Sequence, residues 1–113
     1  MTELELSKAI EDVLVARNVR HMQVAQAALE PGYYLRAARL LREVDGVVLI
    51  ATGFPVTGTF ETDGPVGAII LYQALESLGA KPVLVCGPPL SEALRDDYEL
   101  LELKARSLED AQL

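Results

Sequence analysis

Residues 47–67 read VVLIATGFPVTGTFETDGPVG, which combines a strand, a glycine-bearing loop and the start of a helix. Residues 47–51 form a continuous aliphatic run of the kind found in strands that are buried on both faces. Asp63, Gly64 and Pro65 predict where the helix begins, because proline suits the first turn, in which its missing N–H is not needed. Strand, loop and helix N-terminus in this order form the part of an open α/β sheet where small ligands bind. We therefore expect the functional residues in this stretch.

A second strand follows the helix. The helix carries apolar residues around much of its girth, which predicts extensive burial, and Gly79 predicts its end. Residues 83–86 then form a short apolar strand. Two strands joined by one helix predict a parallel, right-handed βαβ unit. The expected fold class is therefore α/β: a Rossmann-like βαβ arrangement with a short parallel sheet flanked by helices, whose few strands indicate half of a larger three-layer domain.

Helical periodicity also marks the segments on either side of this unit. The predicted helices before it are residues 7–17, 22–29 and 34–44. Their expected buried residues are Leu6, Ile10, Val13 and Leu14 in the first helix and Leu35, Ala38, Leu41 and Val44 in the third. Beyond the second strand, residues 91–97 predict a short helix and residues 98–103 a third strand. One continuous helix over residues 91–106 is the alternative.

Composition and charge narrow the class of protein. With 113 residues, the chain has the length of a single domain over residues 1–113, either whole or part of a longer one. Its net charge of −7 speaks against nucleic acid or an anionic membrane as partner, because both need a basic face. A single cysteine and the lack of an apolar run of ~20 residues lead us to expect a cytoplasmic protein. The thin sheet leaves an uncovered edge, which favours a homo-oligomer or a partner chain that supplies the missing half.

The loop and the helix start offer groups that suit a small acidic ligand. The first helical turn presents free amides, expected to be those of Val66 and Gly67, and the positive end of the helix dipole favours a carboxylate. Glu61 and Asp63 add two carboxylates beside these amides. A zwitterionic amino acid matches both features, because its carboxylate can face the amides and its ammonium group the acids. Each acid also has a simpler interpretation, Asp63 as the N-cap of the helix and Glu61 as a solvated loop residue.

The expected site therefore contains two kinds of residue. Glu61 and Asp63 are the candidate catalytic residues. The candidate substrate-binding residues are Thr52, Gly53, Phe54, Pro55, Thr62, Gly64, Pro65, Val66 and Gly67. No metal-ligand set is predicted, although the two acids could hold a magnesium or manganese ion, and the glycine spacing differs from the dinucleotide fingerprint G-x-G-x-x-G. His21 is interpreted as a surface turn residue and Cys86 as a buried, unreactive thiol.

The pattern T-G-F-P at residues 52–55 and E-T-D-G-P-V-G-A at residues 61–68 is long and unusual. Together with Ala74-Leu75 and Leu78-Gly79, it resembles the signature of the D-glutamate cyclase family, and the resemblance covers the N-terminal half of that family's domain. Enzymes of this family interconvert D-glutamate and 5-oxo-D-proline with loss or gain of water. The resemblance therefore implies a lyase whose ligand, a small acidic amino acid or its lactam, lies at residues 52–67.

The reaction suggests roles for the candidate residues. Cyclisation needs a deprotonated α-amino group that attacks the γ-carboxyl group, so Glu61 or Asp63 is the candidate general base. The helix amides and threonine hydroxyls would stabilise the developing oxyanion. The competing hypothesis is a non-catalytic chain, a fragment or a subunit, that binds a small acidic metabolite or assembles with a partner. In that case we expect a loop open to solvent and an exposed apolar edge or face of the sheet.

Overall fold

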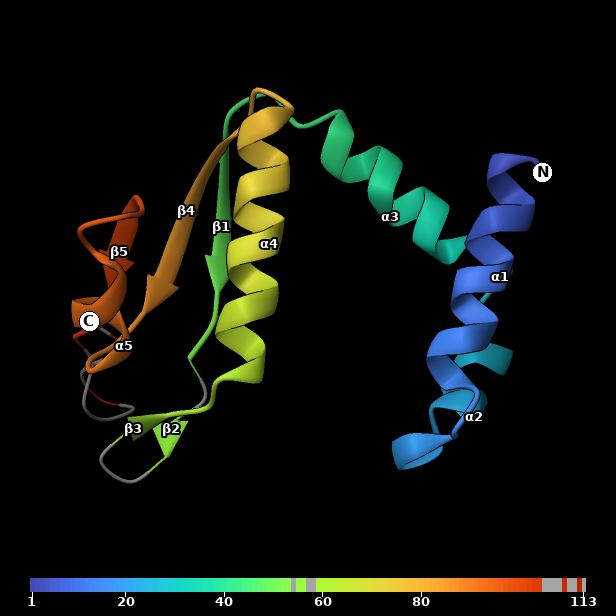
Figure 1. Ribbon diagram of the computed structural model, residues 1–113, viewed down its shortest axis with the longest axis horizontal. Helices are drawn as coiled ribbons and strands as arrows, with labels where there is room; N and C mark the ends of the chain where they lie inside the picture. Colours follow the sequence, from blue (N-terminus) through green and yellow to red (C-terminus); the bar gives the residue numbers. More distant parts are fainter. Residues whose placement is uncertain (54, 57–58, 105–108, 110–111, 113) are drawn as a thin grey trace. The chain divides into compact units, whose positions relative to one another are not determined.

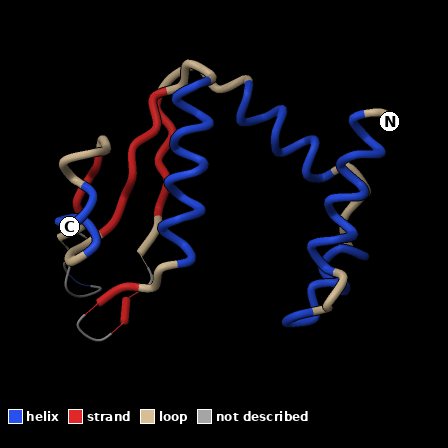
Figure 2. Tube along the Cα trace, viewed as in Figure 1, coloured by secondary structure: helices blue, strands red, loops and turns tan. Residues whose placement is uncertain are grey.

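The structure, a computed structural model, describes residues 1–53, 55–56, 59–104, 109 and 112 (Figure 1). Contacts within the chain define two compact units, Met1–Glu43 and Val44–Leu113. The first unit consists of helices and connecting turns, whereas the second also contains strands (Figure 2). None of the described helices is long and apolar enough to cross a membrane. The assignment of residues 1–113 to one domain stays a prediction.

Three α-helices and one 3₁₀ turn make up the first unit. Their bounds are Glu3–Val15 (α1), Val19–His21 (η1), Met22–Ala27 (α2) and Tyr33–Arg42 (α3). α1 begins at a capping box, in which Thr2 Oγ1 accepts from the amide of Glu5 at 3.1 Å and the Glu5 carboxylate accepts from the amide of Thr2 at 2.7 Å. The predicted break before α2 coincides with a left-handed backbone at Asn18, Arg20 and His21, and His21 is exposed, as interpreted. The three predicted helices are confirmed, with ends that shift by a few residues.

Two of the three buried residues of α1, Ser7 and Glu11, are polar, and the third is Val15. Ser7 and Glu11 are only 5% and 1% exposed. Glu11 Oε1 accepts hydrogen bonds from Ser7 Oγ at 2.7 Å and from the amide of Tyr34 at 3.1 Å. Glu11 Oε2 accepts from the amide of Gly32 at 3.1 Å, and Ser7 Oγ accepts from the amide of Leu35 at 3.0 Å. Two side chains of α1 therefore satisfy amides at the start of α3 that have no partner within that helix.

The apolar residues expected to be buried in α1 are instead exposed. Between 42% and 74% of the surface is accessible at Leu6, Ile10, Val13 and Leu14. The stripe expected in the third helix is confirmed only in part, because Ala38 is exposed and the half-buried residues are Leu35, Leu41 and Val44. The prediction for α1 is wrong because helical periodicity does not reveal that the start of α3 needs hydrogen-bond acceptors, which the polar face of α1 supplies.

The second unit contains the predicted βαβ arrangement. The strands of its sheet run parallel in the order β1-β4-β5 and are Val47–Ala51 (β1), Lys81–Cys86 (β4) and Leu100–Glu102 (β5). Helix α4, Asp63–Ser77, lies between β1 and β4 in the chain, and helix α5, Leu90–Leu94, lies between β4 and β5 (Figure 1). The α/β fold class is confirmed, as is the helix followed by a strand predicted for residues 91–103.

The loop between β1 and α4 contains a short hairpin. Pro55–Val56 (β2) pairs antiparallel with Thr59–Phe60 (β3). Figure 1 shows this hairpin beyond the carboxyl end of β1, near the first turn of α4. The sequence predicted only a loop here, because strands of two residues are too short to show the alternation that identifies a strand.

One face of the sheet is covered by side chains and the other is open. Ile50 on β1, and Leu84 and Cys86 on β4, are 8% exposed or less, whereas Val47 and Leu49 on β1 are each 62% exposed. The prediction that β1 is buried on both faces is therefore wrong. An aliphatic run shows that a strand can be buried on both faces, but not whether the chain supplies side chains to cover each of them.

Helix α4 is likewise buried along one stripe only. Its buried residues are Pro65, Ala68, Tyr72 and Leu75. Val66, Ile70 and Leu78 are exposed, so the expected burial around much of the helix is wrong. The physical reason is the same as for β1, because the outer side of the helix meets too few side chains to cover its apolar residues.

The end of α4 matches the prediction. Gly79 has a φ of +88°, and its amide donates to the carbonyl of Glu76 at 3.0 Å. The amide of Ala80 donates to the carbonyl of Leu75 at 3.1 Å. These two bonds form a Schellman motif, which closes a helix through a residue in the left-handed conformation. Glycine adopts that backbone without strain.

We expect Gly79→Ala to lower the free energy of unfolding by about 1 kcal/mol, since alanine is strained at a left-handed position. The matched control is Gly67→Ala in α4, where an added Cβ meets no atom within 4 Å. That change should raise the free energy of unfolding by about 0.5–1 kcal/mol, because alanine is the better helix former. Urea unfolding followed by circular dichroism measures both. Equal effects of the two substitutions would contradict the role of Gly79.

Glu11 should make the first unit sensitive to acid. Burial opposes the ionisation of Glu11, but the hydrogen bonds from Ser7, Gly32 and Tyr34 and the charge of Arg36 outweigh it and lower its pKa. A carboxylate whose pKa is lowered by folding contributes stability above its ordinary pKa of about 4.3 and loses that contribution as the pH falls through the folded-state value.

We expect Glu11→Gln to reduce the protection of the Gly32 and Tyr34 amides from hydrogen exchange at neutral pH, because these amides donate to the two carboxylate oxygens of Glu11 and glutamine offers one acceptor oxygen in place of two. The difference from the wild type should shrink as the pH falls through the lowered folded-state pKa of Glu11, where the wild-type carboxylate also becomes neutral. Exposed Glu30 provides the control, and Glu30→Gln should change neither amide. Unchanged protection in Glu11→Gln would show that the carboxylate does not hold the start of α3.

Candidate functional site

The carboxyl ends of the three parallel strands bring distant parts of the sequence to one edge of the sheet. Cys86 pairs with Glu102 in the β4–β5 register, and Ala51 pairs with Val85 in the β1–β4 register. Thr52 therefore follows β1 beside Cys86, and its amide donates to the carbonyl of Val85 at 3.0 Å. Because neighbouring strands lie about 4.8 Å apart, the row from Thr52 through Cys86 to Glu102 spans about 10 Å.

Helix α4 begins at this same edge (Figure 1). Thr62 is its N-cap, and in the described part of the chain the Thr62 side chain makes no capping hydrogen bond. Asp63 is already the first helical residue, so the interpretation of Asp63 as the N-cap is wrong. Glu61, Thr62, Asp63 and Gly64 are all exposed. The start of the helix is therefore open to a small molecule.

The position of the cap determines which amides are free. Val66 donates to the carbonyl of Thr62 at 3.4 Å, and the amide of Gly67 falls within the regular helical ladder. These two amides are therefore not free, contrary to the prediction. Because Pro65 has no N–H, the unpaired amides of the first turn, among the described residues, are those of residues 63–64.

Glycines let the loop pass close to its neighbours. Gly53 has a φ of +98°, and an added Cβ would lie 3.0 Å from Leu90 Cδ2 and 3.4 Å from Cys86 Cβ. At Gly64, an added Cβ would lie 3.5 Å from Thr52 Oγ1. The first residues of the loop therefore lie against both α5 and the start of α4. Of the predicted site residues, the structure brings Thr52, Gly53 and Gly64 together.

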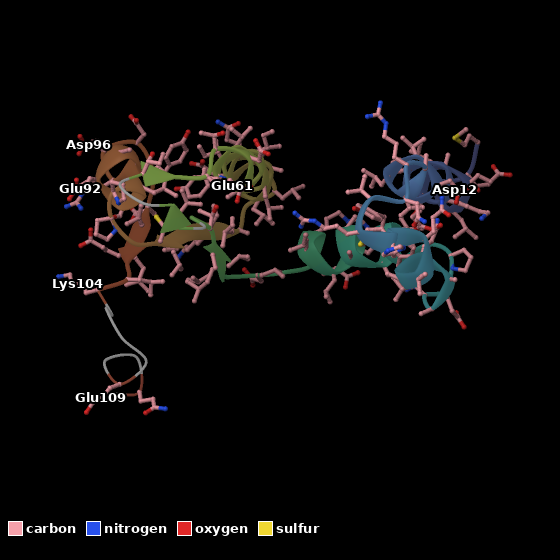
Figure 3. All side chains as sticks on the ribbon, turned by 90° about the horizontal axis from the view of Figure 1, so that it is seen from below. Asp12, Glu61, Glu92, Asp96, Lys104 and Glu109 are labelled. Atoms are coloured by element: carbon pink, nitrogen blue, oxygen red, sulfur yellow. The ribbon has the colours of Figure 1, made fainter. Side chains whose placement is uncertain are left out.

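The other predicted site residues are spread over the loop and the helix. Figure 3 labels Glu61, which lies near the start of α4. Pro65 is buried in α4 and Pro55 belongs to β2, while Phe54 lies outside the described residues. Among the described residues, no group of three or more His, Cys, Asp or Glu side chains is placed to hold a metal ion. A divalent cation at the site stays a prediction.

Sequence reasoning missed a polar cluster at the β5 end of the same edge. The cluster comprises Ser91 on α5, Arg95 at the end of α5 and Glu102 on β5. Glu102 Oε1 accepts from Ser91 Oγ at 2.7 Å and from Arg95 Nη2 at 2.9 Å. Ser91 is fully buried, whereas the side chains of Glu102 and Arg95 are 25% and 51% exposed. The four-residue spacing of Ser91 and Arg95 was visible in the sequence, but their shared acceptor is identified only by the pairing of β5 with β4.

The cluster keeps Glu102 ionised. The hydrogen bond from Ser91 lowers the pKa of Glu102, burial opposes this, and the charges of Arg95 and Lys104 add to the lowering. Burial raises the pKa of the Cys86 thiol, and the nearby charge of Glu102 raises it further. Glu102 is therefore a weak base. Cys86 is fully buried and stays a neutral thiol, as interpreted from the sequence.

Comparison with known proteins identifies the family. The family model described as "D-glutamate cyclase-like, C-terminal" matches residues 10–112, and the chain therefore belongs to the D-glutamate cyclase-like family. This confirms the family that the sequence resembles. The description refers to a C-terminal region, whereas the resemblance pointed to an N-terminal half. No curated protein and no solved structure matches the chain.

We expect Ser91→Ala to raise the pKa of Glu102 toward its ordinary value of about 4.3, because the Ser91 hydroxyl is the largest cause of the lowering. NMR detection of side-chain carboxyl carbons during an acid titration measures this pKa directly. Ser77→Ala is the matched control, because the Ser77 hydroxyl donates to the carbonyl of Gln73 within α4. An unchanged Glu102 pKa in Ser91→Ala would show that this hydrogen bond does not set the charge of the cluster.

Proposed function

We propose that this member of the D-glutamate cyclase-like family interconverts D-glutamate and 5-oxo-D-proline at the carboxyl edge of its parallel sheet. The observation that carries the proposal is the start of α4, where the exposed carboxylates Glu61 and Asp63 adjoin the unpaired amides of residues 63–64. The close approach of Thr52 to Gly64 adds a hydroxyl beside this turn. The family match over residues 10–112 supports the same reaction.

Each charged group of D-glutamate has a counterpart at the start of α4. The ammonium group is attracted to Glu61 and Asp63. The γ-carboxyl group faces the amides of residues 63–64, where the positive end of the helix dipole favours a negative oxygen. Thr52 and Thr62 can donate hydroxyl hydrogen bonds from the same turn. A polyphosphate would be repelled by the two acids, so a small amino acid is the better match.

The reaction needs only acid–base chemistry. Glu61 or Asp63 takes a proton from the ammonium group, and the freed amine attacks the γ-carbon. A C–N bond forms and one γ C–O bond breaks. One hydrogen of the ammonium group stays on the lactam nitrogen, and the other two leave with the oxygen as water. The amides of residues 63–64 stabilise the negative oxygen of the tetrahedral intermediate.

The second candidate function is that of a non-catalytic chain that assembles with another polypeptide. The observation that favours it is exposed apolar surface, at Val47 and Leu49 on β1 and at Val66 on α4. In the sheet formed by the described strands, β1 is an edge strand, and its outer backbone groups can pair with another chain. Assembly and catalysis are compatible, because a partner that covers the exposed side of α4 at Val66 could also close the site.

We expect the purified chain to convert D-glutamate to 5-oxo-D-proline, and Glu61→Gln to lower turnover by about 100-fold or more, the usual contribution of a general base. Glu76→Gln changes an exposed acid near the other end of α4 and should leave turnover unchanged. Chiral chromatography of the product measures conversion, and sedimentation velocity on the same sample measures assembly.

The possible results separate the two candidates. Unchanged turnover in Glu61→Gln would exclude Glu61 as the base and leave Asp63, which Asp63→Asn tests in the same assay. A chain that sediments as an assembly and converts neither compound would support the non-catalytic function.

A further inference from the structure

The cluster of Ser91, Arg95 and Glu102 extends the proposed site. We propose, on the basis of the proposed function, that Arg95 binds the α-carboxylate of D-glutamate and that Glu102, held by Ser91, orients Arg95 for this contact. The reacting groups of the substrate would then lie at α4 and its unreactive carboxylate at α5. In this arrangement Arg95 is a substrate-binding residue, and Ser91 and Glu102 are positioning residues.

The cluster and the start of α4 lie on the same edge of the sheet. Glu102 pairs with Cys86, which lies beside Thr52, and Thr52 in turn contacts the first turn of α4 at Gly64. This row spans about 10 Å. A dicarboxylate that contacts both the start of α4 and Arg95 would therefore lie along this row.

Arg95 has donors available for a ligand. Its Nη2 donates to Glu102 at 2.9 Å, while about half of the side chain remains exposed. Among the described residues, Glu102 is the acceptor that Arg95 contacts. A guanidinium group carries five N–H donors in one plane, so the pair with Glu102 leaves others that can bind a carboxylate in a bidentate manner.

The distribution of charge supports the same assignment. Glu61 and Asp63 attract the ammonium group of D-glutamate but repel its second carboxylate, and the two amides of α4 accommodate one carboxyl group. The α-carboxylate therefore needs a cation elsewhere on the edge, and Arg95 supplies it. Glu102 stays ionised and so keeps Arg95 in place. Between the two ends, Cys86 is a buried neutral thiol and adds no competing charge.

A purely structural role for Arg95 predicts a different pattern. Ser91 is fully buried and connects α5 to β5 through Glu102 without help from Arg95. An ion pair as exposed as the one between Arg95 and Glu102 usually contributes little to stability. Removal of the Arg95 side chain should therefore affect ligand binding far more than folding.

The test compares D-glutamate with 4-aminobutyrate, which is the same molecule without the α-carboxylate, by isothermal titration calorimetry on the full chain. We expect Arg95→Gln to weaken binding of D-glutamate by about tenfold or more, the usual loss for a hydrogen bond between charged groups, and to leave binding of 4-aminobutyrate unchanged. Arg95→Lys keeps the charge but not the planar fork, so it should recover only part of the affinity. Lys104→Gln removes another exposed cation near Glu102 and is the control, which should change neither affinity.

The outcomes distinguish this inference from the proposed function. An equal loss for both ligands, or an unchanged affinity of Arg95→Gln for D-glutamate, would overturn the role of Arg95 and leave the proposed function intact. A wild-type chain that binds neither D-glutamate nor 5-oxo-D-proline would overturn both. Urea unfolding checks that Arg95→Gln is folded. If Arg95→Gln does not fold, the same titrations are made with Arg95→Lys. An affinity of Arg95→Lys for D-glutamate equal to that of the wild type would then overturn the inference.

Discussion

The parallel pairing of β1 with β4 is the constraint on which the rest of the second unit depends. Parallel strands cannot be joined by a tight turn, so the chain must return along the sheet as a helix before the second strand begins. The register is held at the amino end by the amide of Lys81, which donates to the carbonyl of Gly46 at 2.8 Å. Because α4 runs back along the sheet, its first turn lies at the carboxyl edge. There it meets Thr52 after β1, and Glu102 at the end of β5 lies along the same row.

Features that act through the local backbone could be predicted from the sequence. The aliphatic run before Thr52 indicated a strand, Pro65 indicated a first helical turn, and Gly79 indicated a helix end, since each acts within a few residues of the chain. The α/β class followed from their order. The N-cap was misplaced by one residue because Thr62 and Asp63 are both favoured at that position. With Thr62 as the N-cap, Val66 donates to the carbonyl of Thr62, and the unpaired amides of the first turn, among the described residues, are those of residues 63–64.

Interactions between elements could not be predicted in the same way. In both units a buried serine donates to a glutamate at 2.7 Å, from Ser7 to Glu11 and from Ser91 to Glu102. The two pairs differ in which carboxylate oxygens remain available for further hydrogen bonds. Both oxygens of Glu11 accept backbone amides at the start of α3, so this pair is structural. At Glu102, the hydrogen bonds within the described part of the chain reach Oε1 alone, and one of them comes from a half-exposed arginine. The positions of serine and glutamate in the sequence do not reveal which pair has only a structural role and which leaves a carboxylate oxygen available.

The outer side of α4, around Gly67, bears on both catalysis and assembly. A glycine within a helix lowers stability by about 0.5–1 kcal/mol relative to alanine. At Gly67, an added Cβ would meet no atom of the described chain within 4 Å, so close packing inside the chain does not explain the glycine. Val66 and Ile70 beside it are apolar and exposed. A molecule that packs closely against this side of α4 from outside the chain would explain both the glycine at position 67 and the exposed apolar side chains beside it. A ligand at the amides of residues 63–64, as in the proposed function, and a second polypeptide along the apolar side of α4 would both account for this exposure. If the proposed function holds, a polypeptide that covers the outer side of α4 would also shield a ligand at the start of this helix from water.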